Sequence, residues 1–397
     1  MKKFSLTICA VLFASGPLLA QKIDVKKAFK QADEQTLVML KEVEKVKAGK
    51  GKTDLATPRT IEDGALKLVG SKDWTSGFFP GELWFLYEYT GKKVWMEQAR
   101  AYTSLIEQEQ FNGKTHDMGF KVYCSVGTGY RITKDRHYAD VIIQSAKTLA
   151  TRFNPKTGVI LSWDHSRDKW VNPVIIDNMM NLELLFEATT LTGDSSFYKI
   201  AVSHANVTMK NHFRPDYSSY HVIDYDPNTG AVLKKQTHQG YSHESAWSRG
   251  QAWALYGYTM CYRFTKDPAY LKQAENIAGF ILNHKNMPED LVPYWDYDAP
   301  NIPNEPRDAS AAAVIASGLY ELSGYSKSKT SYLQKADKML NSLSTKYVSP
   351  VGKNKGFILL QSTGSKPSNS EVDVPLSYAD YYYLEALLRY KGLKDKS

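Results

Sequence analysis

The residues from Ser242 to Gly257 combine polar and aromatic side chains that could bind a charged ligand. The stretch reads SHESAWSRGQAWALYG, with polar residues first and an apolar helix after them. Glu244 and Ser245 stand where the first turn of a helix favours an acidic residue or a cap. Arg249 and Trp253 are four positions apart and so share one face of that helix. A guanidinium beside an indole suits a carboxylated sugar, because one pairs with the carboxylate and the other covers the ring. The alternative is an N-capped core helix with one surface arginine.

Two aspartates are candidates for acid–base chemistry. Asp117 lies in the segment His116–Phe120, and Asp177 follows the apolar residues 174–176. A carboxyl group in apolar surroundings keeps its proton more readily, and so does one of two carboxyls that share a site. A protonated carboxyl beside an ionised one is the arrangement that general acid catalysis needs. Spacing alone leaves open which aspartate is the acid.

An internal repeat indicates how these residues are positioned. A threonine followed by Gly or Lys, an aromatic residue five positions after the threonine and an alanine four later recur from Thr90, Thr192 and Thr265. The copy at Thr133 has isoleucine for alanine, and the copy at Ser323 carries an insertion. The Thr–Gly or Thr–Lys pair ends one helix, while the aromatic residue and alanine share a face of the next. Roughly twelve helices with few strands therefore predict an all-α toroid of six helical hairpins, an (α/α)6 barrel, with an open superhelix as the alternative.

In such a toroid the inner helices run parallel, so their N-termini open at one mouth. Polar or acidic residues occur at all six predicted inner-helix starts, in segments 74–81, 116–120, 173–178, 245–253, 307–310 and 377–381. Asp and Ser are favoured at helix starts on energetic grounds alone. We therefore interpret Asp308 and Asp380 as caps.

The composition is that of an ordinary globular protein, with 43% hydrophobic and 23% charged residues. A net charge of +8 permits an anionic ligand without requiring one. The absence of dense basic runs argues against nucleic-acid binding. No zinc-like Cys/His spacing or Gly-rich phosphate loop occurs, so we expect no metal and no cofactor. Cys124 and Cys261 lie in apolar, helix-like segments and are predicted to be buried free thiols.

The first twenty residues are typical of a secretory signal peptide. A basic start is followed by an apolar run from Phe4 to Leu12 and by a small residue, Ala20, before the expected cut. The run is too short to span a membrane, and no other segment approaches that length. Cys9 lies too early for lipid attachment. We expect an exported protein, periplasmic or secreted, with a single catalytic domain over 21–397.

The chain resembles glycoside hydrolase family 88, the unsaturated glucuronyl hydrolases, over nearly its whole mature length. The resemblance rests on segments 74–84, 116–120, 175–182, 245–253, 307–313 and 379–386, in that order. It implies an (α/α)6 barrel and anionic substrates, which are oligosaccharides that polysaccharide lyases leave with a terminal 4,5-unsaturated uronic acid. In such enzymes an aspartate protonates C4 of the enol ether and water adds at C5. The sugar ring then opens and releases its neighbour, so the usual two-carboxylate rules do not apply simply.

The resemblance also implies a role for each matching residue. Asp177 looks like the general acid, which then serves as base toward water, and Asp117 looks like its partner. The positions similar to substrate-contacting residues are Trp74, Trp163, His221, Gln239, Arg249 and Trp253, with His116 at the rim. Ser362, Ser365 and the adjacent Lys366 occupy a C-terminal loop where related enzymes place small hydroxyl residues that hold the carboxylate. A solvated turn is the alternative there.

Other functions stay open at this stage. An unsaturated rhamnogalacturonyl hydrolase has a similar barrel and acts on pectin fragments, although the motifs around Arg249 and Asp380 favour the glucuronyl enzyme. A sugar epimerase on the same toroid would rely on paired histidines, where this chain offers paired aspartates. A non-catalytic carbohydrate-binding toroid would have no turnover to lose if Asp177 were replaced.

Overall fold

The protein is described by a computed structural model that covers residues 23–50 and 54–395. The predicted signal peptide lies outside the described residues. Within them, six inner helices alternate along the chain with six outer ones. The inner helices are α2 (Phe78–Thr90), η2 with α4 (Gly119–Gly127 and Thr128–Thr133), α6 (Asn178–Thr192), α8 (Ser248–Thr265), α10 (Ala309–Ser323) and α12 (Ser377–Lys394). The outer helices are α1 (Val25–Lys50), α3 (Lys93–Ser104), α5 (Arg136–Ala150), α7 (Ser195–Asn211), α9 (Pro268–Asn283) and α11 (Lys329–Lys346).

The inner helices form a closed ring. Each packs against the next one along the chain, from α2 through η2, α6, α8 and α10 to α12, and α12 packs back against α2. An open superhelix would lack that last contact. The predicted (α/α)6 barrel is therefore confirmed.

The repeated threonine determines the turn from each inner helix to the next outer one. Thr192 Oγ1 donates to the carbonyl of Ala188 at 2.7 Å and accepts the amide of Asp194 at 3.1 Å. Gly193 between them has a left-handed φ of 74°, and Asp194 caps α7 by accepting from the amide of Ser196. The copies at Thr90, Thr133 and Thr265 make the same two threonine hydrogen bonds. The threonine thus satisfies polar groups of both helices at once.

Burial differs between the two rings of helices as the repeat predicts. The aromatic residue and the small or branched residue four positions later are buried in every copy: Trp95 and Ala99, Tyr138 and Ile142, Phe197 and Ala201, Tyr270 and Ala274, Tyr332 and Ala336. Outer helices therefore bury one face. The inner helix α10 is buried without interruption from Ala309 to Tyr320, as expected for a helix surrounded by others. Cys124 and Cys261 are buried and free, as predicted.

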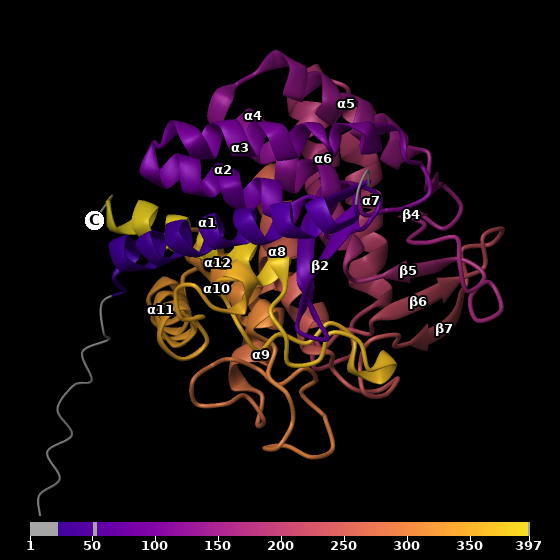
Figure 1. Ribbon diagram of the computed structural model, residues 1–397. Coiled ribbons are helices and arrows are strands. Elements are labelled where there is room, and N and C mark those ends of the chain that lie inside the picture. Colours follow the sequence, from indigo (N-terminus) through magenta and orange to yellow (C-terminus); the bar gives the residue numbers. More distant parts are fainter. Residues whose placement is uncertain (1–22, 51–53, 396–397) are drawn as a thin grey trace, which may run out of the picture.

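Short strands form three small sheets around the barrel. They are the hairpin β1 (Leu55–Glu62) with β2 (Ala65–Gly70), the pair β3 (Phe153–Asn154) with β4 (Val159–Ile160), and the sheet β5 (Pro173–Ile175), β6 (Val222–Tyr225) and β7 (Val232–Gln236). Figure 1 shows the last sheet on one side of the helices. The prediction that 173–175 begin a helix is wrong, because these residues pair with β6 and α6 begins only at Asn178. None of the described helices is long and apolar enough to cross a membrane.

Candidate active site

Asp177 stands at the N-cap position of α6, but its side chain caps nothing. No amide of the helix donates to its carboxylate. Its Oδ2 is buried without a hydrogen bond and lies 3.5 Å from Nε2 of His221. An unsatisfied buried oxygen costs folding free energy, so a carboxylate kept in this state needs another explanation than stability. Asp177 is therefore not a helix cap, although it stands where one is favoured.

His221 is held against Asp177 by the sheet. Its backbone carbonyl accepts the amide of Ile176 at 3.0 Å, directly beside the pairing of β5 with β6. Its ring Nδ1 accepts the amides of His238 and Gln239, each at 3.1 Å. Since Nδ1 accepts, the ring proton is on Nε2, which faces Asp177. The fold therefore sets both the position and the tautomer of this histidine.

Asp117 lies on the other side of a second histidine. Thr115 Oγ1 donates to Oδ2 of Asp117 at 2.9 Å, and His116 Nε2 lies 3.2 Å from its Oδ1. Burial lowers the pKa of His116, while the charges of Asp117 and Asp177 oppose that shift. The pKa of His116 therefore depends on the charges of both aspartates. It is only 2% exposed, so its predicted place at the rim is wrong.

The predicted tryptophans differ in how much surface they offer. Trp74 is partly exposed and contacts the rings of Tyr378 and Phe120, with centroid distances of 5.0 and 5.4 Å. Trp163 is also partly exposed and stacks on His165 at 5.2 Å. Trp253 has no exposed surface. In this structure Trp253 supports the aromatic wall from behind, because Phe120 packs directly on it at 5.1 Å.

Arg249 is buried, at 1% exposure, which excludes the surface-arginine alternative. Its guanidinium donates to Asp308 Oδ2 at 2.8 Å and to the carbonyls of Thr363 and Gly364. Gln239 Nε2 also donates to the carbonyl of Gly364, at 3.1 Å. Both terminal nitrogens of the guanidinium are thus already occupied, and of its three nitrogens only Nε is buried without a partner. Two predicted site residues instead fix the C-terminal loop over the barrel mouth.

The hydroxyls of that loop have unequal surroundings. Ser362 is buried, and its Oγ has no hydrogen-bond partner. Ser365 is half-buried, and its Oγ donates to Ser368 Oγ at 3.1 Å. Lys366 lies 4.0 Å from Glu305. Ser362 is therefore the residue of this loop with an unused donor.

The remaining predicted caps divide into one that is confirmed and one that is wrong. Asp308 caps α10 through the amides of residues 310 and 311, at 3.1 and 3.3 Å. Asp380 lies inside the first turn of α12, and its carboxylate accepts the amides of Ile358 and Leu359, at 2.9 and 2.7 Å. Burial raises the pKa of Asp380, and both burial and the Asp380 charge raise that of Glu82. Asp380 thus anchors a separate segment and does not cap its own helix.

The predicted start of α8 is also wrong. The helix begins at Ser248 with Trp247 at the N-cap position. Ser245 Oγ donates to Asp296 Oδ2 at 2.7 Å, and Glu244 is exposed. The bend before the helix therefore depends on a bridge to a distant aspartate that local spacing cannot indicate.

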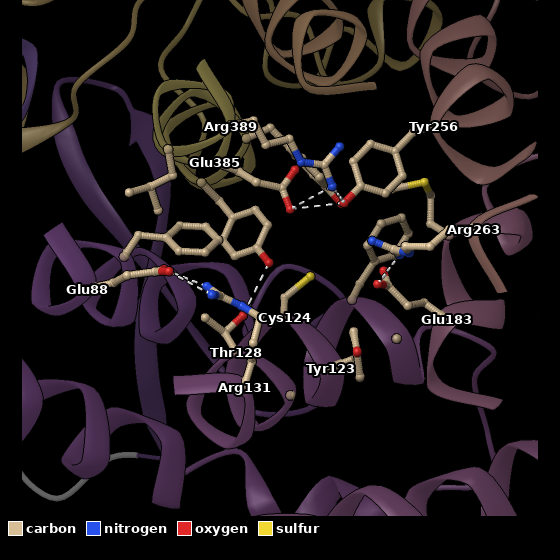
Figure 2. Close-up of a pocket in the computed structure, with 18 residues that line it drawn as sticks. Glu88, Tyr123, Cys124, Thr128, Arg131, Glu183, Tyr256, Arg263, Glu385 and Arg389 are labelled. Carbon is tan, nitrogen blue, oxygen red and sulfur yellow. Dashed lines mark hydrogen bonds and ion pairs between the residues drawn. The ribbon is translucent and has the colours of Figure 1, made fainter. Parts of the chain in front are cut away.

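A cavity of about 330 Å³ lies inside the ring of inner helices. Figure 2 shows its wall of paired charges, in which Glu88 meets Arg131, Glu183 meets Arg263 and Glu385 meets Arg389. These residues come from the inner helices, several from their C-terminal turns, and none is a predicted site residue. Their charges are largely paired with each other. Within the described residues, no group of three His, Cys, Asp or Glu side chains could hold a metal ion.

The family model that matches the chain is Glycosyl Hydrolase Family 88, over residues 52–392, which include every site residue above. The chain belongs to this family. It is 54% identical over 327 residues to an unsaturated glucuronyl hydrolase of Formosa agariphila, covering 82% of each chain. It is similar to a solved unsaturated glucuronyl hydrolase specific for heparin, at 47% identity and a TM-score of 0.88, covering 94% of this chain and 98% of that one. The enzyme from Bacillus sp. GL1 matches at 30% identity and a TM-score of 0.83, covering 92% and 97%.

This family 88 glycoside hydrolase also has site residues that the sequence analysis missed. His238 lies between Trp163 and His221, with ring centroids 5.8 and 6.4 Å away. Burial, followed by the His221 and Lys169 charges, lowers its pKa to about 4. Trp170 packs on the same rings, 5.6 Å from both Trp163 and His238. The position of His238 directly before Gln239 was a usable signal, whereas nothing local marks Trp170.

Proposed function

We propose that this hydrolase removes the 4,5-unsaturated glucuronic acid from the non-reducing end of oligosaccharides made by polysaccharide lyases. The observation that carries the proposal is the carboxylate of Asp177, which is buried, takes no part in capping and faces Nε2–H of His221. Relatives named unsaturated glucuronyl hydrolase and unsaturated chondroitin disaccharide hydrolase support the substrate class.

In the proposed reaction, Asp177 gives its proton to C4 of the enol ether. Positive charge then develops over C5 and the ring oxygen, and the His221 Nε2–H stabilises the carboxylate that Asp177 has become. Water adds to C5 and returns a proton to Asp177. The resulting hemiketal opens, which yields a keto acid and frees the neighbouring sugar. Asp117, held by Thr115 and His116, is proposed to orient the substrate beside this carboxyl group.

The carboxylate of the unsaturated sugar needs donors that the fold leaves unused. The Nε of Arg249 and the Oγ of Ser362 are both buried without a partner. A carboxylate accepting from them would also face the positive guanidinium, whose charge Asp308 shares at 2.8 Å. Trp74 and Trp163, both partly exposed, are proposed to cover the two faces of the sugar.

The test follows the ultraviolet absorbance of the enol ether in unsaturated disaccharides from chondroitin, hyaluronan, heparin and ulvan. We expect the band to disappear with the wild-type enzyme, and in D₂O we expect one deuterium at C4 of the keto-acid product. A stable band on every glucuronyl substrate, with folded enzyme, would refute the proposal. Loss of the band only on unsaturated rhamnogalacturonyl substrates would establish the pectin-directed alternative instead.

We also propose that residues 1–20 direct export to the periplasm or the medium. The support is the pattern of a basic start, a short apolar run and a small residue at the cut. N-terminal sequencing of protein from the native host should begin at Gln21. A mature protein that retains Met1 would contradict export by this route.

A further inference from the structure

A second pocket, of about 430 Å³, opens beside the sheet β5–β7. Its lining residues are Lys169, Trp170, Lys234, Gln236, Thr237, His238 and His243. None of these is acidic, and neither lysine takes part in an ion pair with a carboxylate of the described residues. The pocket therefore has two ammonium groups that form no ion pair with a carboxylate in the described part of the protein. Asp224, which is paired with Lys234 in the sheet, instead accepts the amides of Val171 and Asn172.

A hydrogen bond to the backbone places the Lys234 ammonium against the Lys169 segment of the pocket wall. Lys234 Nζ donates to the backbone carbonyl of Lys169 at 2.7 Å. Lys169 Nζ lies 5.9 Å from the ring of Trp170. The next residue along β7, Lys235, does not line the pocket and packs over the ring of Tyr220 at 5.3 Å. Successive side chains of a strand point to opposite faces, so only Lys234 of this pair serves the pocket.

Neutral donors complete the lining. Gln236 Oε1 accepts from Nε1 of Trp170 at 2.7 Å, and its amide nitrogen lies 3.4 Å from Nε2 of His243, so one of its two N–H groups stays available. Thr237 Oγ1 accepts the amide of Gly240 at 2.8 Å and keeps its own proton to donate. Ammonium, amide and hydroxyl donors without a competing carboxylate are the surroundings that an anion such as a sulfate or carboxylate prefers.

The pocket adjoins the site of Asp177 and His221. Trp170 and His238 both line it, and both rings contact Trp163. The His238 ring is 6.4 Å from that of His221, which faces Asp177. One imidazole ring thus separates the pocket from the histidine at the catalytic carboxylate. A substrate whose first sugar lies at Asp177 could extend its next groups into the pocket.

We propose that this pocket is a subsite for an anionic group, a sulfate ester or a carboxylate, on the part of the oligosaccharide that follows the unsaturated sugar. The inference rests on the proposed function for the identity of the substrate. The subsite would favour charged over neutral leaving portions, because both lysines act on an anion within a Debye length. It would contribute to KM more than to kcat, since it lies away from the bond that reacts.

The test compares kcat/KM for an unsulfated unsaturated disaccharide, its counterpart sulfated on the leaving sugar, and an unsulfated tetrasaccharide with a second uronate. Lys169→Gln and Lys234→Gln should each lower kcat/KM for one charged substrate by about 2- to 5-fold relative to the unsulfated disaccharide. Lys235→Gln is the matched control, with the same charge change on the other face of the same strand. Loss on the sulfated disaccharide identifies sulfate, and loss on the tetrasaccharide identifies the carboxylate.

An unchanged charged-to-neutral ratio in both pocket variants, or an equal change in Lys235→Gln, would overturn the subsite. Failure of the proposed function looks different, because the wild-type enzyme would then leave every unsaturated glucuronyl substrate intact. In that case calorimetric binding of a saturated sulfated disaccharide still tests the pocket. Weaker binding to Lys234→Gln but not to Lys235→Gln would support it, and equal binding to both would overturn it.

Discussion

Asp177 and Asp308 occupy the same position at the start of an inner helix, yet replacing each by Asn should have opposite consequences. Asp177 caps nothing, and its Oδ2 is buried without a hydrogen bond. Asn has nearly the same shape, and the change removes no hydrogen bond to Oδ2 and no helix cap. For Asp177→Asn we therefore expect an unfolding free energy within about 0.5 kcal/mol of wild type, or up to about 1 kcal/mol higher. A proton donor in general acid catalysis is worth about 10²- to 10⁴-fold, so kcat should fall by that factor, roughly 3 to 5 kcal/mol of barrier.

Asp308→Asn is the matched control, because Asp308 serves the fold in two ways. It accepts two amides of α10 and pairs with Arg249 at 2.8 Å, and both residues are buried. Asn still caps a helix, so the cap survives. The guanidinium loses its counter-charge, and leaving a buried charge unpaired costs about 3–5 kcal/mol. We expect that loss in unfolding free energy, together with weaker substrate binding as the carbonyls of Thr363 and Gly364 lose their anchored partner.

The assay combines urea unfolding with initial rates from the enol-ether absorbance for both variants. Substrate binding to Asp177→Asn, measured by calorimetry, should persist. A loss of more than about 2 kcal/mol in the unfolding free energy of Asp177→Asn would refute the reasoning, because it would give that carboxylate a structural role. A fall in kcat of less than about tenfold would also refute the reasoning, because loss of a general acid lowers the rate by more than that.

Two further predictions concern the fold. Burial raises the pKa of Glu82 and Asp380, so the folded protein holds protons that the unfolded chain releases above about pH 4, and this pair makes stability fall as pH rises. Glu82→Gln should flatten that fall in urea unfolding between pH 5 and 8, and parallel curves for variant and wild type would contradict the pairing. Gly193→Ala should lower the unfolding free energy by about 1 kcal/mol, because φ is 74° there and no atom crowds the new methyl group. Gly279→Ala, inside α9 and equally uncrowded, should raise it by about 0.5–1 kcal/mol, and equal effects of the two changes would refute the left-handed C-cap.

The sequence by itself determined the barrel, because each copy of the repeat contains the residues that end one helix, form the turn and bury a face of the next helix. Thr192 satisfies groups of two successive helices, Gly193 supplies the left-handed turn, and Phe197 with Ala201 forms the face that must be buried. These interactions span only a few residues and so can be read locally. The family was predictable for the same reason, since its motifs are short segments in a fixed order.

Only the tertiary structure decided what each polar residue at the mouth does. Asp177, Asp308 and Asp380 look alike beside a helix start, but one faces His221, one caps and pairs, and one holds a distant segment. Their partners come from strands and loops far along the chain, and a carboxylate's role follows from which donors reach it. The same holds for Lys234, whose orientation toward a pocket depends on the register of β7 within its sheet. Local spacing determines the position of a residue within its helix or strand. The packing of separate elements determines which partners its side chain contacts.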